Sequence, residues 1–153
     1  MPAYYFDSSG IAKRYTTEMG SGWVRSIVAE VGNTVIIAEI GTVEVAAAFA
    51  KMQRMGRVTI EERDKYLKLF LRDAAKQYEL VPLNSGIIRV AISLTQKHKL
   101  RGYDAVHLAT ALAVNAELLR KQLPPLTFVA ADEDLLKAAE AGGLVAGNPN
   151  SYP

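Results

Sequence analysis

The sequence predicts an α/β fold in which a mainly parallel sheet is covered by helices on both faces. Short apolar runs, rich in β-branched and aromatic residues, alternate with longer stretches whose apolar residues recur every three or four positions. The length of 153 residues suits one compact domain. We expect that domain to span residues 1–147, followed by a loose tail over 148–153 that is rich in Asn and Pro.

Five short runs are predicted to be buried strands, because each is dominated by apolar residues and ends at a polar or turn-forming residue. The predicted strands are residues 3–6, 34–38, 79–83, 126–130 and 144–146. Helical stretches separate them, which is the order expected of a parallel sheet.

Apolar stripes at helical spacing lie between these runs. They consist of Trp23, Ile27, Val28 and Val31; Leu67, Phe70, Leu71, Ala74 and Tyr78; Ile87, Val90, Ala91 and Leu94; and Leu108, Ala111 and Leu112. Two consecutive helices, at about 39–55 and 59–78, are predicted between the second and third strands, separated by Gly56. Thr59 and Glu62 have the spacing of a capping box at the start of the second one.

Composition narrows the kinds of chemistry and the location. Half of the residues are hydrophobic and 22% are charged, as in an ordinary globular protein. The chain contains no cysteine, which excludes disulfides, thiolate metal sites and cysteine catalysis. No segment approaches the roughly 18 apolar residues of a membrane span, so we expect a cytoplasmic protein that does not enter a membrane. The net charge is only +2, so any attraction for nucleic acid must come from local basic patches.

Three of the six aspartates lie where a strand ends or a helix begins. Asp7 follows the first strand, Asp132 follows the fourth, and Asp104 opens a predicted helix over 104–119. In open α/β sheets the ligand crevice lies at the carboxyl ends of the strands. Each aspartate taken alone is also explained as a helix N-cap. Asp134, two residues after Asp132, is read as a first-turn acid and a candidate supporting residue.

Glu44 is harder to explain as a surface residue. Its predicted helix has apolar residues at Ile40, Val43, Ala47 and Ala50, and Glu44 lies within that stripe. A glutamate on a buried helix face needs a partner. That partner is either a basic residue at the edge of the stripe or a shared functional site.

Acidic side chains that gather in one place require neutralisation. Two carboxylates about 4 Å apart repel by roughly 4 kcal/mol at an effective dielectric near 20. Oxygen ligands without cysteine favour Mg²⁺ or Mn²⁺ over zinc. Such ions orient a water molecule and stabilise charge on phosphate oxygens, which is the chemistry of phosphodiester hydrolysis.

Four segments resemble the motifs of PIN-domain ribonucleases, in order and over nearly the whole chain. They are residues 5–15 (YFDSSGIAKRY), 42–46 (TVEVA), 101–111 (RGYDAVHLATA) and 128–139 (FVAADEDLLKAA). The third segment is the most specific. Within that family the sequence is most similar to VapC-type toxins of toxin–antitoxin pairs.

The resemblance implies a three-layer α/β/α fold with a five-stranded, mainly parallel sheet. It also implies Mg²⁺- or Mn²⁺-dependent cleavage of RNA, homodimerisation and inhibition by a small antitoxin protein. The family's metal ligands map onto Asp7, Glu44, Asp104 and Asp132. One position departs from the pattern: many members have Thr or Ser where this chain has Ala130.

Several neighbouring residues are candidates for a supporting role. Ser8 is expected either to replace the missing hydroxyl or to cap the first helix, and His107 either to assist a carboxylate or to pack in the core. Candidate RNA-binding residues are Lys13, Arg14, Lys99 and Arg101, although such charges are often only solvated.

Two other functions compete with the nuclease. One is a phosphatase or phosphotransferase with Asp7 as nucleophile, although Ser9 breaks the Asp-x-Asp pattern of haloacid dehalogenase-like enzymes. The other is a non-catalytic nucleic-acid-binding module of the same fold. A dinucleotide-binding domain is disfavoured, because no glycine-rich fingerprint follows the first strand.

Overall fold

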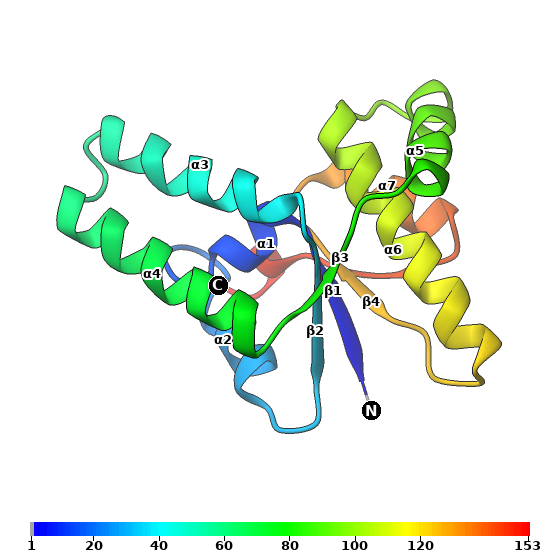
Figure 1. The fold of residues 1–153 in the computed structure, drawn as a ribbon, viewed down its shortest axis with the longest axis horizontal. Helices are drawn as coiled ribbons and strands as arrows, with labels where there is room; N and C mark the ends of the chain where they lie inside the picture. The colour runs from blue at the N-terminus through cyan, green and yellow to red at the C-terminus, as the bar shows by residue number, and fades with distance from the viewer. Residues whose placement is uncertain (1) are drawn as a thin grey trace.

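The computed structural model describes residues 2–153. Its centre is a five-stranded sheet in the order β3-β2-β1-β4-β5, with helices on both faces (Figure 1). All four strand pairings are parallel. The predicted three-layer α/β class is therefore confirmed, and the sheet is parallel throughout rather than mainly so.

The strands lie where the apolar runs predict them: β1 and β2 have the predicted bounds, β3 and β4 are shorter, and β5 is shifted by one residue. Their bounds are β1 Ala3–Phe6, β2 Thr34–Ala38, β3 Glu79–Val81, β4 Thr127–Val129 and β5 Val145–Gly147. The central strand β1 is hydrogen-bonded to β2 on one side and to β4 on the other.

The helices fill the connections between the strands. Their bounds are α1 Ser8–Ala12, α2 Ser21–Ala29, α3 Gly41–Arg54, α4 Ile60–Lys76, α5 Ser85–Lys97, α6 Gly102–Arg120 and α7 Glu133–Ala141, followed by the 3₁₀ helix η1 Pro149–Ser151. The capping box at the start of α4 is present, with Thr59 and Glu62 bonded to each other's backbone N–H groups. Helix α6 begins two residues before the predicted start at Asp104.

Alternation along the strands divides the core into two clusters. Tyr5, Ile36 and Phe128 pack with α5, α6 and α7 on one face of the sheet. Phe6 and Ile37 are among the residues that pack with α1 to α4 on the other face. Figure 1 shows the two helical layers on either side of the sheet. Side chains that alternate with period two on a sheet covered on both faces give this arrangement.

Some residues of the predicted stripes are not buried. Val31 lies beyond the end of α2 at Ala29 and is fully exposed. Leu71 and Val90 lie on the outer faces of their helices and are 49% and 43% exposed. Helix α2 is therefore shorter than its apolar stripe suggests, and the helices that contain Leu71 and Val90 have narrower buried faces than predicted.

The C-terminal tail is not loose, which corrects the prediction for residues 148–153. Asn148 caps η1, Pro149 is buried, and the ring of Tyr152 stacks on Trp23 of α2 with centroids 4.4 Å apart. These contacts hold the tail against the helical layer beside β5.

The strand order places a topological switch point between β1 and β4. The chain runs from β1 to β2 and β3 on one side, then crosses to β4 and β5 on the other. Crevices at the carboxyl ends of the strands open at such points. No helix in residues 2–153 is long and apolar enough to cross a membrane.

Candidate active site

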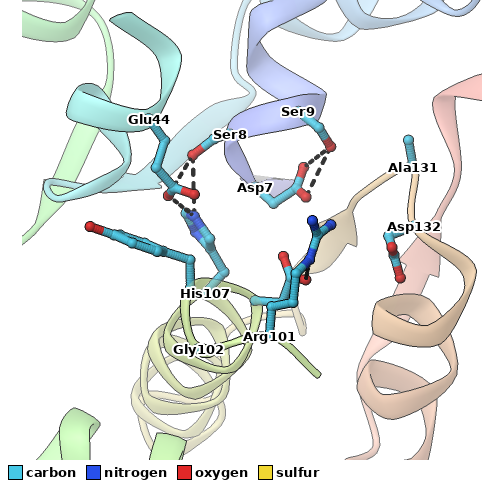
Figure 2. Close-up of a pocket in the computed structure, with 11 residues that line it drawn as sticks. Asp7, Ser8, Ser9, Glu44, Arg101, Gly102, His107, Ala131 and Asp132 are labelled. Carbon is cyan, nitrogen blue, oxygen red and sulfur yellow. Dashed lines mark hydrogen bonds and ion pairs between the residues drawn. The ribbon is translucent and has the colours of Figure 1, made fainter. Parts of the chain in front are cut away.

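A cavity of about 590 Å³ opens at the switch point between β1 and β4. Acidic side chains from four separate segments line it: Asp7 after β1, Glu44 on α3, Asp104 on α6 and Asp132 before α7. Figure 2 shows Asp7 in the middle, with Glu44 on one side and Asp132 on the other. The structure thus brings all four sequence-predicted acids to one place.

Asp7 is a buried carboxylate held by local donors. It is the N-cap of α1, and its Oδ1 accepts a hydrogen bond from the backbone N–H of Gly10 at 2.7 Å. The hydroxyl of Ser9 donates to both carboxylate oxygens, at 2.9 and 3.0 Å. Loss of solvation and the nearby charge of Asp104 raise the pKa of Asp7 to about 6, against the hydrogen bonds that lower it. Asp7 is therefore the helix N-cap that the sequence allows, and its carboxylate also lines the cavity.

Glu44 lies in the first turn of α3 and has two side-chain partners. Its Oε1 accepts a hydrogen bond from Ser8 Oγ at 2.9 Å and lies 2.6 Å from Nε2 of His107. Ser8 thus bonds to Glu44 and does not cap α1. The stripe used to predict a buried Glu44 was wrong, because Val43 is 64% exposed. The buried face of α3 contains instead Gly41, Val45 and Phe49, and Glu44 lies on its flank, with the side chain 26% exposed.

Asp104 faces the cavity from the first turn of α6 and is paired with a basic residue. The Nε of Arg101 lies 3.4 Å from Asp104 Oδ2, but the Arg101 side chain is 84% exposed. Partial burial and the nearby charge of Asp132 raise the pKa of Asp104 even though Arg101 opposes that shift. A strongly exposed guanidinium is therefore too weak a partner to offset the acidic surroundings.

Asp132 caps α7, with its Oδ1 accepting from the backbone N–H of Leu135 at 2.9 Å. It also lines a second cavity of about 420 Å³ that shares Arg101 and Asp104 with the first. Lys99 and Asp134 line only this second cavity. Lys99 and Arg101 are thus positioned beside the acidic cavity, as the sequence predicted.

Two other predicted RNA-binding residues are positioned for structural roles instead. Lys13 is buried, and its ammonium group pairs with Glu18 at 2.7 Å and donates to the carbonyl of Met19. Arg14 is bound to Asp73 at 3.1 Å and to the hydroxyl of Tyr78 at 2.6 Å. Neither residue lines the acidic cavity. The expectation that Lys13 and Arg14 lie beside the acidic site is therefore wrong, because their charged groups are bound to Glu18 and Asp73 instead.

Sequence analysis missed three residues of the site. Ser9 donates to Asp7, the hydroxyl of Tyr5 is hydrogen-bonded to Nδ1 of His107, and a side chain at Gly41 would meet Ser8 Oγ at 3.1 Å. The Asp-x-Ser spacing was a usable pattern for Ser9, whereas Tyr5 and Gly41 are recognised only in three dimensions. Ala130 is fully buried in the core, and the cavity is lined by Ala131 instead.

The donor set has the chemistry of a site for a hard divalent cation, since all four acids offer oxygen atoms. In residues 2–153, no Lys or Arg lies within ion-pair distance of Asp7 or Asp132. Within the same residues, no three His, Asp or Glu side chains are already close enough together to hold a metal ion. A cation held by three or more of these acids would therefore require side-chain rotation in the cavity.

Residues 4–141 match the PIN domain family, and the chain therefore belongs to that family. Its relatives place it among the VapC-type ribonucleases. The sequence is 33% identical over 150 residues to the ribonucleases VapC45 and VapC49 of Mycobacterium tuberculosis, covering 94% of this chain and 93% of each relative.

Solved structures share the same fold. VapBC2 of Rickettsia felis, bound to a DNA fragment of its promoter, gives a TM-score of 0.65 at 15% identity, covering 95% of this chain and 98% of that chain. VapC20 of Mycobacterium tuberculosis, a toxin that cleaves the sarcin–ricin loop, gives a TM-score of 0.61 at 15% identity, covering 98% and 99%. At such low identity these structures establish only the fold.

Proposed function

We propose that this chain is a Mg²⁺- or Mn²⁺-dependent endoribonuclease that hydrolyses RNA phosphodiester bonds, and the toxin of a toxin–antitoxin pair. The observation that carries the proposal is the convergence of Asp7, Glu44, Asp104 and Asp132 on one cavity at the switch point. Asp7 is 4% exposed with no basic partner in the described residues, which favours a bound cation as the missing positive charge.

In this proposal the four acids are the metal ligands. A bound divalent cation supplies Lewis acidity and a water molecule of lowered pKa. Ser9 and Gly10 hold the Asp7 carboxylate in place, as their hydrogen bonds show. Arg101 and Lys99 lie at the border of the cavity, where an exposed positive charge can contact the phosphates of an RNA strand.

The test is cleavage of a structured RNA by the purified chain with Mn²⁺ or Mg²⁺, repeated in EDTA. Activity is expected only with the metal. Removing any one of the four acids is expected to lower the cleavage rate at least about 100-fold. Losing a metal ligand has a larger effect on activity than losing a residue that only hydrogen-bonds to a ligand. The four variants are Asp7→Asn, Glu44→Gln, Asp104→Asn and Asp132→Asn.

Matched controls come from the same substitutions on exposed acids of α4. Asp64→Asn and Glu61→Gln lie away from the cavity and are expected to cleave RNA as the wild type does. Undiminished cleavage in EDTA, or by Asp7→Asn, would contradict the proposal. Hydrolysis of a small phosphomonoester but not of RNA would favour a phosphatase, and RNA binding without cleavage would favour a binding module.

An antitoxin protein and a second copy of this chain are the proposed partners. Several of the structures that share this fold are toxin–antitoxin complexes, including one from Klebsiella pneumoniae with a TM-score of 0.59 at 19% identity. The α3–α4 hairpin, which projects from the body in Figure 1, carries large apolar side chains that are 49–64% exposed: Val43, Met55, Ile60 and Leu71. Such side chains suit contacts with other proteins. Light scattering of the pure chain and co-purification with the product of a neighbouring gene test these partners.

A further inference from the structure

A line of hydrogen bonds runs behind Glu44 from the core of the molecule. The hydroxyl of Tyr5 lies 2.8 Å from Nδ1 of His107, and Nε2 of His107 lies 2.6 Å from Glu44 Oε1. Ser8 Oγ donates to the same carboxylate oxygen. The four residues come from β1, α6, α3 and α1, so the line connects the sheet to three helices. Figure 2 shows Ser8 and His107 converging on the Glu44 carboxylate.

The inner part of this line is buried and closely packed. Tyr5 is fully buried and His107 is 2% exposed. The Tyr5 ring stacks on Phe128 with centroids 5.6 Å apart and an angle of 7° between the planes. A Cβ on Gly41 would lie 3.2 Å from His107 Cε1, which is tighter than ordinary contact. The absence of a side chain at residue 41 is thus what lets His107 and Ser8 approach Glu44.

The contacts also show which ring nitrogen of His107 faces Glu44 as a donor. A carboxylate oxygen only accepts hydrogen bonds, so Nε2 must be the donor to Glu44. A phenol hydroxyl both donates and accepts, so Tyr5 can bond to Nδ1 in either role. The arrangement therefore requires a proton on Nε2, and the bond at Nδ1 holds the ring in the orientation that points Nε2 at Glu44.

We propose that His107, held by Tyr5, is a positioning residue that fixes the carboxylate of Glu44 for metal binding. Both side-chain bonds reach Oε1, and in residues 2–153 no hydrogen bond reaches Oε2. Oε2 is therefore free to act as a ligand in the cavity that Glu44 lines. This role rests on the proposed nuclease function, because it supports a ligand of the proposed metal. Residues behind metal ligands typically alter metal affinity 10- to 100-fold.

The first test is the affinity for Mn²⁺, measured by calorimetry on the wild type, His107→Leu and His107→Gln. His107→Leu fills the space without a donor and is expected to weaken binding roughly 10- to 100-fold. His107→Gln places an amide donor near the original Nε2 and is expected to recover most of that loss. Asn115→Leu is the matched control, since it also removes a hydrogen bond of a buried side chain, to the backbone N–H of Leu126, and Asn115 lines neither cavity.

The second test reads the tautomer of His107 directly in the metal-free protein. The chain has only two histidines, so ¹⁵N labelling of histidine gives two imidazoles to assign by NMR. The wild type is expected to show a proton on Nε2 of His107. Tyr5→Phe removes the hydroxyl that holds Nδ1 and is expected to weaken Mn²⁺ binding, while the Phe128 stacking is retained. Tyr5→Phe also tests the positioning role if His107→Leu does not fold.

The outcomes separate the two proposals. If the wild type cleaves RNA while folded His107→Leu binds Mn²⁺ as tightly as the wild type, the positioning role is overturned and the nuclease stands. A wild-type His107 that carries no proton on Nε2 also overturns that role. If the wild type neither binds Mn²⁺ nor cleaves RNA, the proposed function fails and the role of His107 fails with it.

Discussion

Asp7 combines a structural role with an electrostatic cost. As the N-cap of α1 it satisfies the backbone N–H of Gly10, a bond that stabilises the start of the helix. Its burial places a negative charge where water cannot solvate it, so its pKa rises to about 6. The same side chain therefore stabilises the fold when protonated and destabilises it when ionised.

This conflict predicts a pH-dependent gain in stability for Asp7→Asn in the absence of metal. The folded-state pKa lies above the ordinary aspartate value of 3.8, so the stability present at low pH is lost as pH rises from about 4 to about 6. A shift of about two units corresponds to about 3 kcal/mol. Asparagine keeps the acceptor for Gly10, so Asp7→Asn is expected to gain up to that amount at pH 8 and almost nothing at pH 4.

Urea unfolding in EDTA at the two pH values measures the difference. Asp64→Asn is the control, because the Asp64 side chain is 62% exposed and its removal introduces no comparable pH dependence. Equal stability of the wild type and Asp7→Asn at pH 8 would show that burial of the ionised carboxylate does not lower the free energy of unfolding.

The sequence identified the four acids but could not supply all the reasons for their positions. Glu44 was found through a stripe that includes the exposed Val43, because α3 is rich in alanine and two apolar stripes fit its sequence equally well. Only packing decides that Val45 and Phe49 point inward. Partners such as Tyr5 and His107 are 102 residues apart and leave no local pattern.

At the scale of elements, the end of the short helix α1 determines where Arg14 lies. It ends at Ala12, and the following turns bring Arg14 to Asp73 at the end of α4. The hydroxyl of Tyr15 donates to the same Asp73 carboxylate at 2.8 Å, and Tyr78 completes the cluster. Burial and the neighbouring Tyr78 raise the pKa of Tyr15, so its hydroxyl remains a donor. The cluster ties α1, α4 and the start of β3 together.

The boundaries of elements were predictable to within a few residues, and the long-range pairing was not. The apolar runs predicted the five strands because buried parallel strands are apolar on both faces. The sequence does not indicate the partner of Arg14. Asp73 lies 59 positions after Arg14, and only the fold brings the two side chains together. Proximity in sequence to Asp7 was therefore a poor guide to the role of Lys13 and Arg14.

Comparison of Arg14→Gln with Arg101→Gln tests whether Arg14 stabilises the fold and Arg101 contacts RNA. Arg14→Gln leaves a mostly buried carboxylate short of a partner and is expected to lower the free energy of unfolding by about 1–3 kcal/mol. RNA affinity of the folded variant is expected to be unchanged. Arg101→Gln is expected to change stability by less than about 0.5 kcal/mol and to weaken RNA binding.

The measurements are urea unfolding and RNA affinity at several salt concentrations, with catalysis blocked by EDTA. Loss of one phosphate contact reduces the salt slope of binding by about 1. A reduced slope for Arg14→Gln, or an unchanged one for Arg101→Gln, would reverse the assignment of the two residues.

For the whole molecule, the strand order is what unites the site. Asp7 and Asp132 follow the adjacent strands β1 and β4, while Glu44 arrives on the helix after β2. Helix α6 brings Asp104 from the opposite helical layer. The cavity therefore lies where segments from both layers meet. Repulsion between its carboxylates is expected to lower the stability of the metal-free fold.

Because a cation at this junction would relieve that repulsion, Mn²⁺ is expected to stabilise the entire fold. A ligand that binds only the native state adds about 2.7 kcal/mol at 100 times its Kd. For a domain of this size each kcal/mol raises Tm by about 2–4 °C, so the expected rise is roughly 5–10 °C. Calorimetric melting with increasing Mn²⁺ measures it, and EDTA should reverse it. Asp132→Asn should lose most of the rise and Asp64→Asn none; a rise of equal size in both would mean that Mn²⁺ binds outside the acidic cavity.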